Sequence, residues 1–122
     1  MHRHVLLVDD EPEVRENLRA FLECYGYDVE VAEHGSEALR ILRAQNRPCC
    51  VVLDLFMPVM DGWRFLDELE AGGKPEGVRV VVSTSAPEAA PSNLPVISKP
   101  VNPQRLLEVV GEACRAVSRP TS

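Results

Sequence analysis

The chain lacks the features that mark membrane, nucleic-acid-binding and zinc proteins. No apolar stretch approaches the roughly 20 residues that cross a bilayer, and the first residues show no signal-peptide pattern. A formal net charge of −6 disfavours contact with a phosphate backbone. None of the four cysteines forms a CxxC pair, and the adjacent Cys49 and Cys50 are poorly spaced for zinc. We expect a cytoplasmic protein with buried, reduced thiols, no membrane contact and no direct nucleic-acid partner.

Lysine is also scarce, which makes the position of each lysine informative. Of the 13 basic side chains counted as Lys or Arg, only Lys74 and Lys99 are lysines. Lys99 follows the short apolar run Val96-Ile97, with Ser98 between them. A lysine at the end of a buried strand is costly unless it faces an anion.

Apolar runs of strand length alternate with segments of helical periodicity along the chain. Strand-like runs occupy residues 5–9, 28–32, 49–53, 78–82 and 94–98. Helical patterns follow Pro12, Ser36 as an N-cap, Gly62, and Asn102 as an N-cap. Apolar strands separated by helices are typical of a parallel sheet covered on both faces. We therefore predict a doubly wound α/β domain over residues 1–118, followed by a disordered tail at 119–122.

Acidic, hydroxyl and basic residues come at the ends of these strands. Asp9 and Asp10 end the first strand, Asp54 the third, Ser85 follows the fourth and Lys99 the fifth. In a doubly wound sheet these ends meet at one edge, where ligands bind. Converging carboxylates repel each other unless a cation joins them, and oxygen ligands favour Mg²⁺. Each residue alone also has an ordinary explanation, as a helix N-terminus, a loop acid, a turn serine or a surface lysine.

At this point the chain resembles the receiver domain of bacterial two-component response regulators. The resemblance is carried by Val8-Asp9-Asp10-Glu11-Pro12, Leu53-Asp54-Leu55-Phe56-Met57-Pro58, Met60-Asp61-Gly62, Ser85-Ala86 and Lys99-Pro100. These motifs cover essentially the whole chain in the family's order. The resemblance implies a flavodoxin-like five-stranded parallel sheet in the order 2-1-3-4-5, and a cis peptide bond between Lys99 and Pro100.

The resemblance also implies a role for each site residue. Asp54 is the expected phosphoacceptor, which takes a phosphoryl group from a sensor histidine kinase or a histidine phosphotransfer protein. Asp10 and Asp54 are expected to bind Mg²⁺, with Asp9 acting through water and the backbone carbonyl of Phe56 as a further ligand. Ser85 is expected to hydrogen-bond the phosphoryl group and Lys99 to pair with it. The sequence leaves open whether Thr84 takes the place of Ser85.

Two departures from the family pattern change the expected output. The segment 86–98 contains three prolines and is too short for a fourth helix with two loops, so we expect that helix to be missing or much shortened. Val96 stands where receivers commonly have an aromatic switch residue. In addition, Phe56 stands at the expected mouth of the pocket, where its ring would hinder an attacking water.

The first hypothesis is a stand-alone receiver whose phosphorylated state is recognised by an unknown target protein. There are three alternatives to it. The chain is equally consistent with one domain cut from a larger regulator or hybrid kinase. A phosphorylation-independent adaptor would keep the pocket but signal otherwise. A phosphohydrolase of the haloacid-dehalogenase type is disfavoured, because Phe56 occupies the position of its second acid. Monomer and homodimer are both open, and Arg15 and Arg19 are expected to be exposed on the kinase-docking helix.

Overall fold

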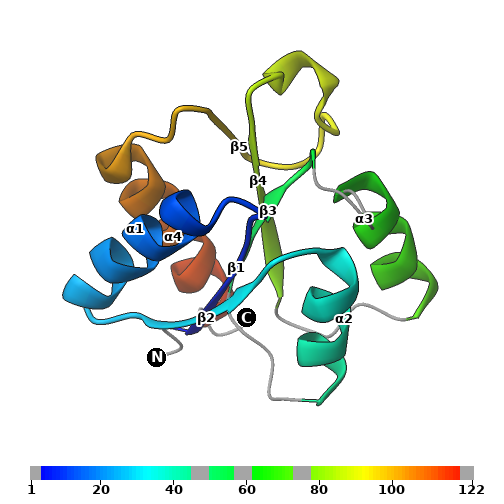
Figure 1. The fold of residues 1–122 in the computed structure, drawn as a ribbon, viewed down its shortest axis with the longest axis horizontal. Helices are drawn as coiled ribbons and strands as arrows, with labels where there is room; N and C mark the ends of the chain where they lie inside the picture. Colours follow the sequence, from blue (N-terminus) through cyan, green and yellow to red (C-terminus); the bar gives the residue numbers. More distant parts are fainter. Residues whose placement is uncertain (1–3, 45–49, 57–61, 73–77, 119–122) are drawn as a thin grey trace.

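Five parallel strands form the centre of the fold, in the order β2-β1-β3-β4-β5 (Figure 1). The computed structural model describes residues 4–44, 50–56, 62–72 and 78–118. The strands are β1 (His4–Val8), β2 (Asp28–Ala32), β3 (Cys50–Asp54), β4 (Arg79–Thr84) and β5 (Val96–Ser98). The helices are α1 (Pro12–Cys24), α2 (Gly35–Ala44), α3 (Gly62–Ala71) and α4 (Pro103–Ser118). The predicted fold class and strand order are therefore confirmed.

The helices cover the sheet from both sides, with α1 and α4 on one face and α2 and α3 on the other (Figure 1). Alternate residues of β1 explain how one strand serves both layers. Val5 and Leu7 pack with α1 and α4, whereas Leu6 and Val8 pack with α2 and α3. Because both faces are buried, each central strand carries a continuous apolar run, with polar residues only at its ends.

Local signals set most helix boundaries, and one prediction about them is wrong. Asn102 caps α4 as predicted, since its Oδ1 accepts hydrogen bonds from the amides of Gln104 and Arg105 at 2.9 and 3.2 Å. Ser36 does not cap α2, which begins at Gly35. Instead, the ring of His34 accepts a hydrogen bond from the Glu37 amide at 3.3 Å. The predicted tail at 119–122 lies outside the described residues.

The connection between β4 and β5 contains no full helix. Its only helical piece is the 3₁₀ turn η1 (Pro87–Ala89), which lies beyond the carboxyl ends of the strands in Figure 1. Proline lacks an amide hydrogen and clashes with the preceding turn, so three prolines in this segment prevent a longer helix. The prediction that the fourth family helix is much shortened is confirmed, and α4 therefore corresponds to the fifth helix of a receiver.

The thiol prediction is only partly correct. Cys50 is buried and free, and burial raises the pKa of its thiol to about 12. Cys24 is free but exposed, because it occupies the last position of α1. Cys114 is buried but disulfide-bonded, so the expectation of a reduced thiol is wrong there.

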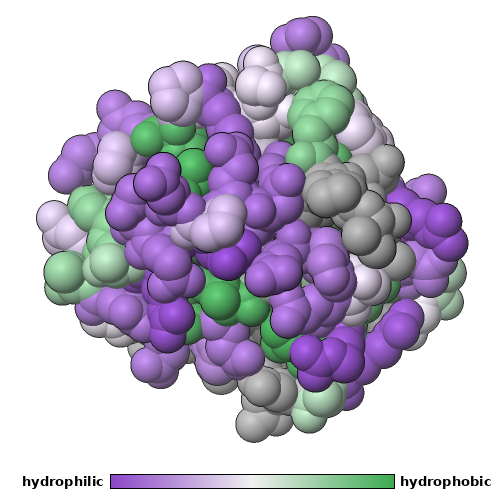
Figure 2. All heavy atoms as spheres, viewed as in Figure 1, coloured by the Kyte–Doolittle hydropathy of each residue, from purple (hydrophilic) through white to green (hydrophobic). Residues whose placement is uncertain are grey.

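The face of the molecule drawn in Figure 2 is mainly hydrophilic. Figure 2 shows mostly hydrophilic side chains on this face, with apolar ones in small separate patches. In the described parts of the chain, no helix combines the length and apolar character that a membrane span requires.

Candidate functional site

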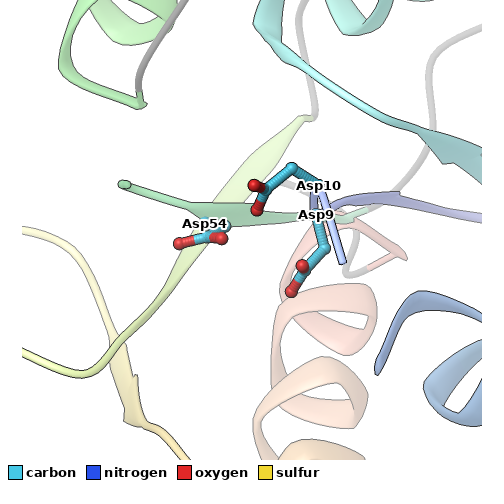
Figure 3. Close-up of side chains that lie close together, drawn as sticks. All are labelled: Asp9, Asp10 and Asp54. Atoms are coloured by element: carbon cyan, nitrogen blue, oxygen red, sulfur yellow. The ribbon is translucent and has the colours of Figure 1, made fainter. Parts of the chain in front are cut away.

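Three carboxylates meet at the carboxyl edge of the sheet, between β1 and β3 (Figure 3). Each of Asp9, Asp10 and Asp54 offers one oxygen atom, and these atoms lie within 4.8 Å of one another. Asp9 and Asp54 are each only 3% exposed, and Asp10 is half-buried. They converge because β1 and β3 are neighbours in register, with Val8 opposite Leu53.

The chain turns in the same way at the ends of three neighbouring strands. Oδ1 of Asp9 accepts a hydrogen bond from the Glu11 amide at 2.9 Å, and Oδ1 of Asp54 accepts one from the Phe56 amide at 3.1 Å. On β4, Oγ1 of Thr84 accepts one from the Ala86 amide at 3.1 Å. Such side-chain to backbone bonds orient the acids without any metal.

Lys99 holds two of the carboxylates together. Its Nζ donates to Oδ2 of Asp9 at 3.1 Å and to Oδ2 of Asp54 at 3.2 Å, and lies 3.7 Å from Oε1 of Glu11. The lysine reaches this position because its amide pairs with the Thr84 carbonyl at 2.9 Å, next to the end of β4. One positive charge therefore faces three negative ones.

Burial and charge act in opposite directions on the two partners. Burial raises the pKa of Asp54 to about 6, although Lys99 and the Phe56 amide lower it. Burial by itself lowers the pKa of Lys99, but the charges of Asp54 and Asp9 outweigh it, so that pKa is raised. A strongly shifted carboxyl with a specific charged partner is typical of functional sites.

A pocket of about 680 Å³ opens beside Asp54. Its lining includes Asp54, Lys99, Ser85 and Phe56, together with residues of α1 and of the segment that precedes α4. Ser85 is exposed in this pocket, whereas Thr84 is fully buried. Both hydroxyl residues thus remain candidates for a phosphoryl contact, and Ser85 is the one that lines the pocket.

The aromatic ring of Phe56 stands at the rim of this pocket. Phe56 is 50% exposed, and its ring packs edge-on against Trp63 of α3 with centroids 5.1 Å apart. The contact restrains the Phe56 ring, which is otherwise free to turn in solvent. Val96 is half-buried in β5, opposite Val82.

One residue of the site was misjudged from the sequence. Arg15 was expected on the exposed surface of α1, but it is only 8% exposed. Its Nη1 donates a hydrogen bond to the backbone carbonyl of Asp9 at 2.9 Å. The helical spacing of Arg15 with Leu18 and Leu22, which form the buried face of α1, is the signal that places it inward.

The donor set suits a hard divalent cation. Three carboxylates whose oxygens lie within 4.8 Å are the kind of ligand that Mg²⁺ prefers. Asp9 and Asp54 also share Lys99, which leaves Asp10 as the carboxylate not engaged by this lysine in the described parts of the chain.

The sheet order and the acidic site place the chain in the class of CheY-like α/β domains. The sequence pattern of the response regulator receiver domain matches residues 5–111, and the chain belongs to this family. Domains of this family act in two-component systems, where phosphorylation and Mg²⁺ are typical, and they are generally signalling modules rather than enzymes. The comparison confirms the resemblance drawn from the motifs.

Curated relatives are longer proteins. The response regulator MprA of Mycobacterium sp. (strain KMS) is 48% identical over 69 residues, which make up 57% of this chain and 30% of that protein. The response regulator Rre1 of Synechocystis sp. is 40% identical over 82 residues, or 66% of this chain and 35% of that protein. The chain thus matches about a third of their length.

Solved structures match nearly the whole chain. The receiver domain of a signal transduction histidine kinase from Syntrophus aciditrophicus has a TM-score of 0.82 and 27% identity, covering 98% of this chain and 95% of that one. The response regulator TrrA of Thermotoga maritima, solved with Mg²⁺ and BeF, has a TM-score of 0.79 and 30% identity, covering 93% and 99%.

Proposed function

We propose that this chain is a phosphoacceptor receiver domain, in which Asp54 accepts a phosphoryl group from a phosphohistidine of a sensor histidine kinase or a histidine phosphotransfer protein. The observation that carries the proposal is the buried Asp54 carboxylate, with Lys99 Nζ at 3.2 Å and two further acids beside it. Oδ of Asp54 attacks phosphorus while the P–N bond to the histidine breaks. The product is an acyl phosphate, and the histidine ring recovers its electron pair.

Mg²⁺ would be held by Asp10 and Asp54, by Asp9 through water, and by the backbone carbonyl of Phe56. When bound, it offsets the negative charge that gathers on the transferring phosphoryl oxygens. Lys99 lies within hydrogen-bond distance of Asp54 and supplies the protein's own positive charge there. Ser85 lines the pocket and is placed to donate its hydroxyl to a phosphoryl oxygen. Hydrolysis of the acyl phosphate by water then restores the free carboxylate.

The proposed setting is the cytoplasm, where phosphorylated sensor kinases present their histidines. A partner protein would read the phosphorylated state, since nothing in the described fold suggests a nucleic-acid-binding face for this acidic chain. The curated relatives are about three times longer than the region that matches. The same chemistry would therefore serve equally as one domain of a larger regulator or hybrid kinase.

Intact-protein mass tests the central step. After incubation with acetyl phosphate and Mg²⁺, the wild type should gain one phosphoryl group, and Asp54→Asn should gain none. Asp67→Asn is a matched control, because Asp67 is exposed on α3 and absent from the pocket. Equal phosphorylation of wild type and Asp54→Asn, or none in either, would refute the proposal.

An adaptor that does not depend on phosphorylation is the second candidate. It is favoured by η1, which replaces a full helix, and by Val96 in place of the usual aromatic residue. Amide chemical shifts distinguish the two functions. A receiver should show shifts along residues 84–99 after phosphorylation, whereas an adaptor should show them only around Asp54.

A further inference from the structure

Arg15 is a buried arginine of α1 that contacts the backbone next to the three acids. Side chains of a helix lean toward its N-terminus, so the guanidinium of Arg15 reaches back to the end of β1. There Nη1 donates to the Asp9 carbonyl at 2.9 Å, in a bond that is itself buried. The other contacts are weaker, with Glu16 and Glu33 carboxylates each 3.9 Å from a guanidinium nitrogen.

The Asp9 carbonyl belongs to the peptide group that joins Asp9 to Asp10. A peptide group is planar, so fixing its carbonyl also fixes the direction in which Asp10 leaves it. On the other side of the residue, the Asp9 amide donates to the Ala32 carbonyl at 3.1 Å. The Asp9 side chain is held as well, by the Glu11 amide and Lys99. Arg15 thus adds a contact from α1 to a residue that is otherwise held by β2, by the Glu11 amide and by Lys99.

Asp10 depends on this backbone more than the other two acids. Asp9 and Asp54 each accept hydrogen bonds from Lys99 and from a backbone amide. Within the parts of the chain that the structure describes, no hydrogen bond or ion pair to the Asp10 carboxylate accompanies them. The direction of that carboxylate is therefore set through the main chain, and Arg15 holds the main chain.

Burial leaves one nitrogen of the Arg15 guanidinium without a hydrogen bond to the part of the chain that the structure describes. Its Nε is buried without a hydrogen-bond partner among the described residues, which costs free energy. An unsatisfied buried group in a folded protein calls for an explanation, and a role in orienting metal ligands from outside the coordination shell is one.

We propose that Arg15 is a positioning residue for the metal site, which orients Asp10 by holding the Asp9–Asp10 peptide. This inference rests on the proposed function only in that Asp10 binds Mg²⁺. A residue of this kind should change metal affinity by about 10-fold when it is removed. Arg15→Met keeps the length and packing of the side chain but loses both the donor and the charge.

Calorimetric titration with MgCl₂ tests the proposal, with each variant's thermal unfolding midpoint measured alongside. Arg15→Met should bind Mg²⁺ about 10-fold more weakly than the wild type, and Arg15→Lys, which keeps one donor, should lie between them. Arg19→Met is the matched control, because Arg19 sits one turn along α1 and pairs only with Glu16 and Glu23 among the described residues. The control should bind as the wild type does.

A double-mutant cycle separates positioning of Asp10 from a general loss of order. If Arg15 acts through Asp10, Asp10→Asn with Arg15→Met should bind no more weakly than Asp10→Asn alone. Additive losses, or an affinity of Arg15→Met within twofold of the wild type, would overturn the inference. A wild type that fails to bind Mg²⁺ overturns it together with the metal site. A wild type that binds Mg²⁺ normally but takes up no phosphoryl group refutes the proposed function alone.

Discussion

Lys99 Nζ lies 3.2 Å from Oδ2 of Asp54, although 45 positions separate the two residues in the sequence. The pair brings the end of β3 together with the residue that follows β5, across the end of β4. The same Nζ lies 3.1 Å from Oδ2 of Asp9, so one lysine offsets the charge of two buried carboxylates.

Asp54→Asn should stabilise the metal-free protein at pH 7.5. A carboxyl whose pKa rises from 3.8 to about 6 on folding destabilises the folded state above that pKa by about 3 kcal/mol. Between these two values the folded state binds more protons than the unfolded chain. Stability of the wild type should therefore increase as the pH falls from 7.5 to 5, relative to Asp54→Asn.

Urea unfolding of both proteins in EDTA measures this difference. A stability difference that stays constant from pH 7.5 to 5 would contradict the raised pKa of Asp54.

Gly62→Ala should destabilise the fold and disturb the acceptor. A Cβ at Gly62 would lie 2.7 Å from Leu55 Cα and 3.0 Å from the Asp54 carbonyl oxygen. Both are backbone atoms, so β3 or α3 has to shift, with a loss of about 1–3 kcal/mol. Gly111→Ala is the control, since a Cβ there meets only the flexible end of Arg115 at 3.3 Å and the Tyr27 hydroxyl oxygen at 3.7 Å. Chemical denaturation should show a loss for the first variant and none for the second.

Phe56→Asn should shorten the lifetime of phosphorylated Asp54. The ring stands at the pocket rim, where it obstructs the approach of water, and Trp63 restrains it. Trp63→Ala should shorten the lifetime less, because Phe56 remains but moves more freely. Loss of the phosphoryl mass with time, after acetyl phosphate is removed, measures the lifetime. Equal decay of Phe56→Asn and wild type would contradict the shielding role.

Ser85→Ala should slow phosphorylation by acetyl phosphate, whereas Thr84→Val should mainly lower stability. Ser85 lines the pocket, but Thr84 is fully buried and its Oγ1 is engaged by the Ala86 amide. Loss of that hydrogen bond should cost about 1 kcal/mol. If Thr84→Val slows phosphorylation and Ser85→Ala does not, the phosphoryl contact belongs to Thr84.

Sequence patterns were sufficient for the elements that are governed by local or periodic constraints. The apolar strands, the Asn102 cap and the proline-limited connection all follow from short-range rules, and the structure confirms them. The cis bond between Lys99 and Pro100 is also present, as the resemblance implied. The three acids converge because strand ends meet at one edge of a parallel sheet.

Contacts between side chains and distant parts of the chain could not be predicted from sequence patterns. Arg15 was taken for a surface residue because arginine is normally exposed, and nothing local reveals that its guanidinium bonds the Asp9 carbonyl. The cap of α2 was misplaced because the chain offers Ser36 and His34 two positions apart, and only geometry shows that the ring of His34 accepts the bond. The roles of Ser85 and Val96 stay predictions.

The segment between β4 and β5, which contains η1, is restricted in its backbone conformations. Pro87, Pro91 and Pro95 each fix one backbone torsion, so this segment is stiff even though most of it is not helical. A full helix at this place could fray or unfold, whereas proline-restricted segments have fewer conformations to lose or gain. If Asp54 is the phosphoacceptor proposed above, we expect a movement that starts there to displace this segment mainly as one unit about its two ends.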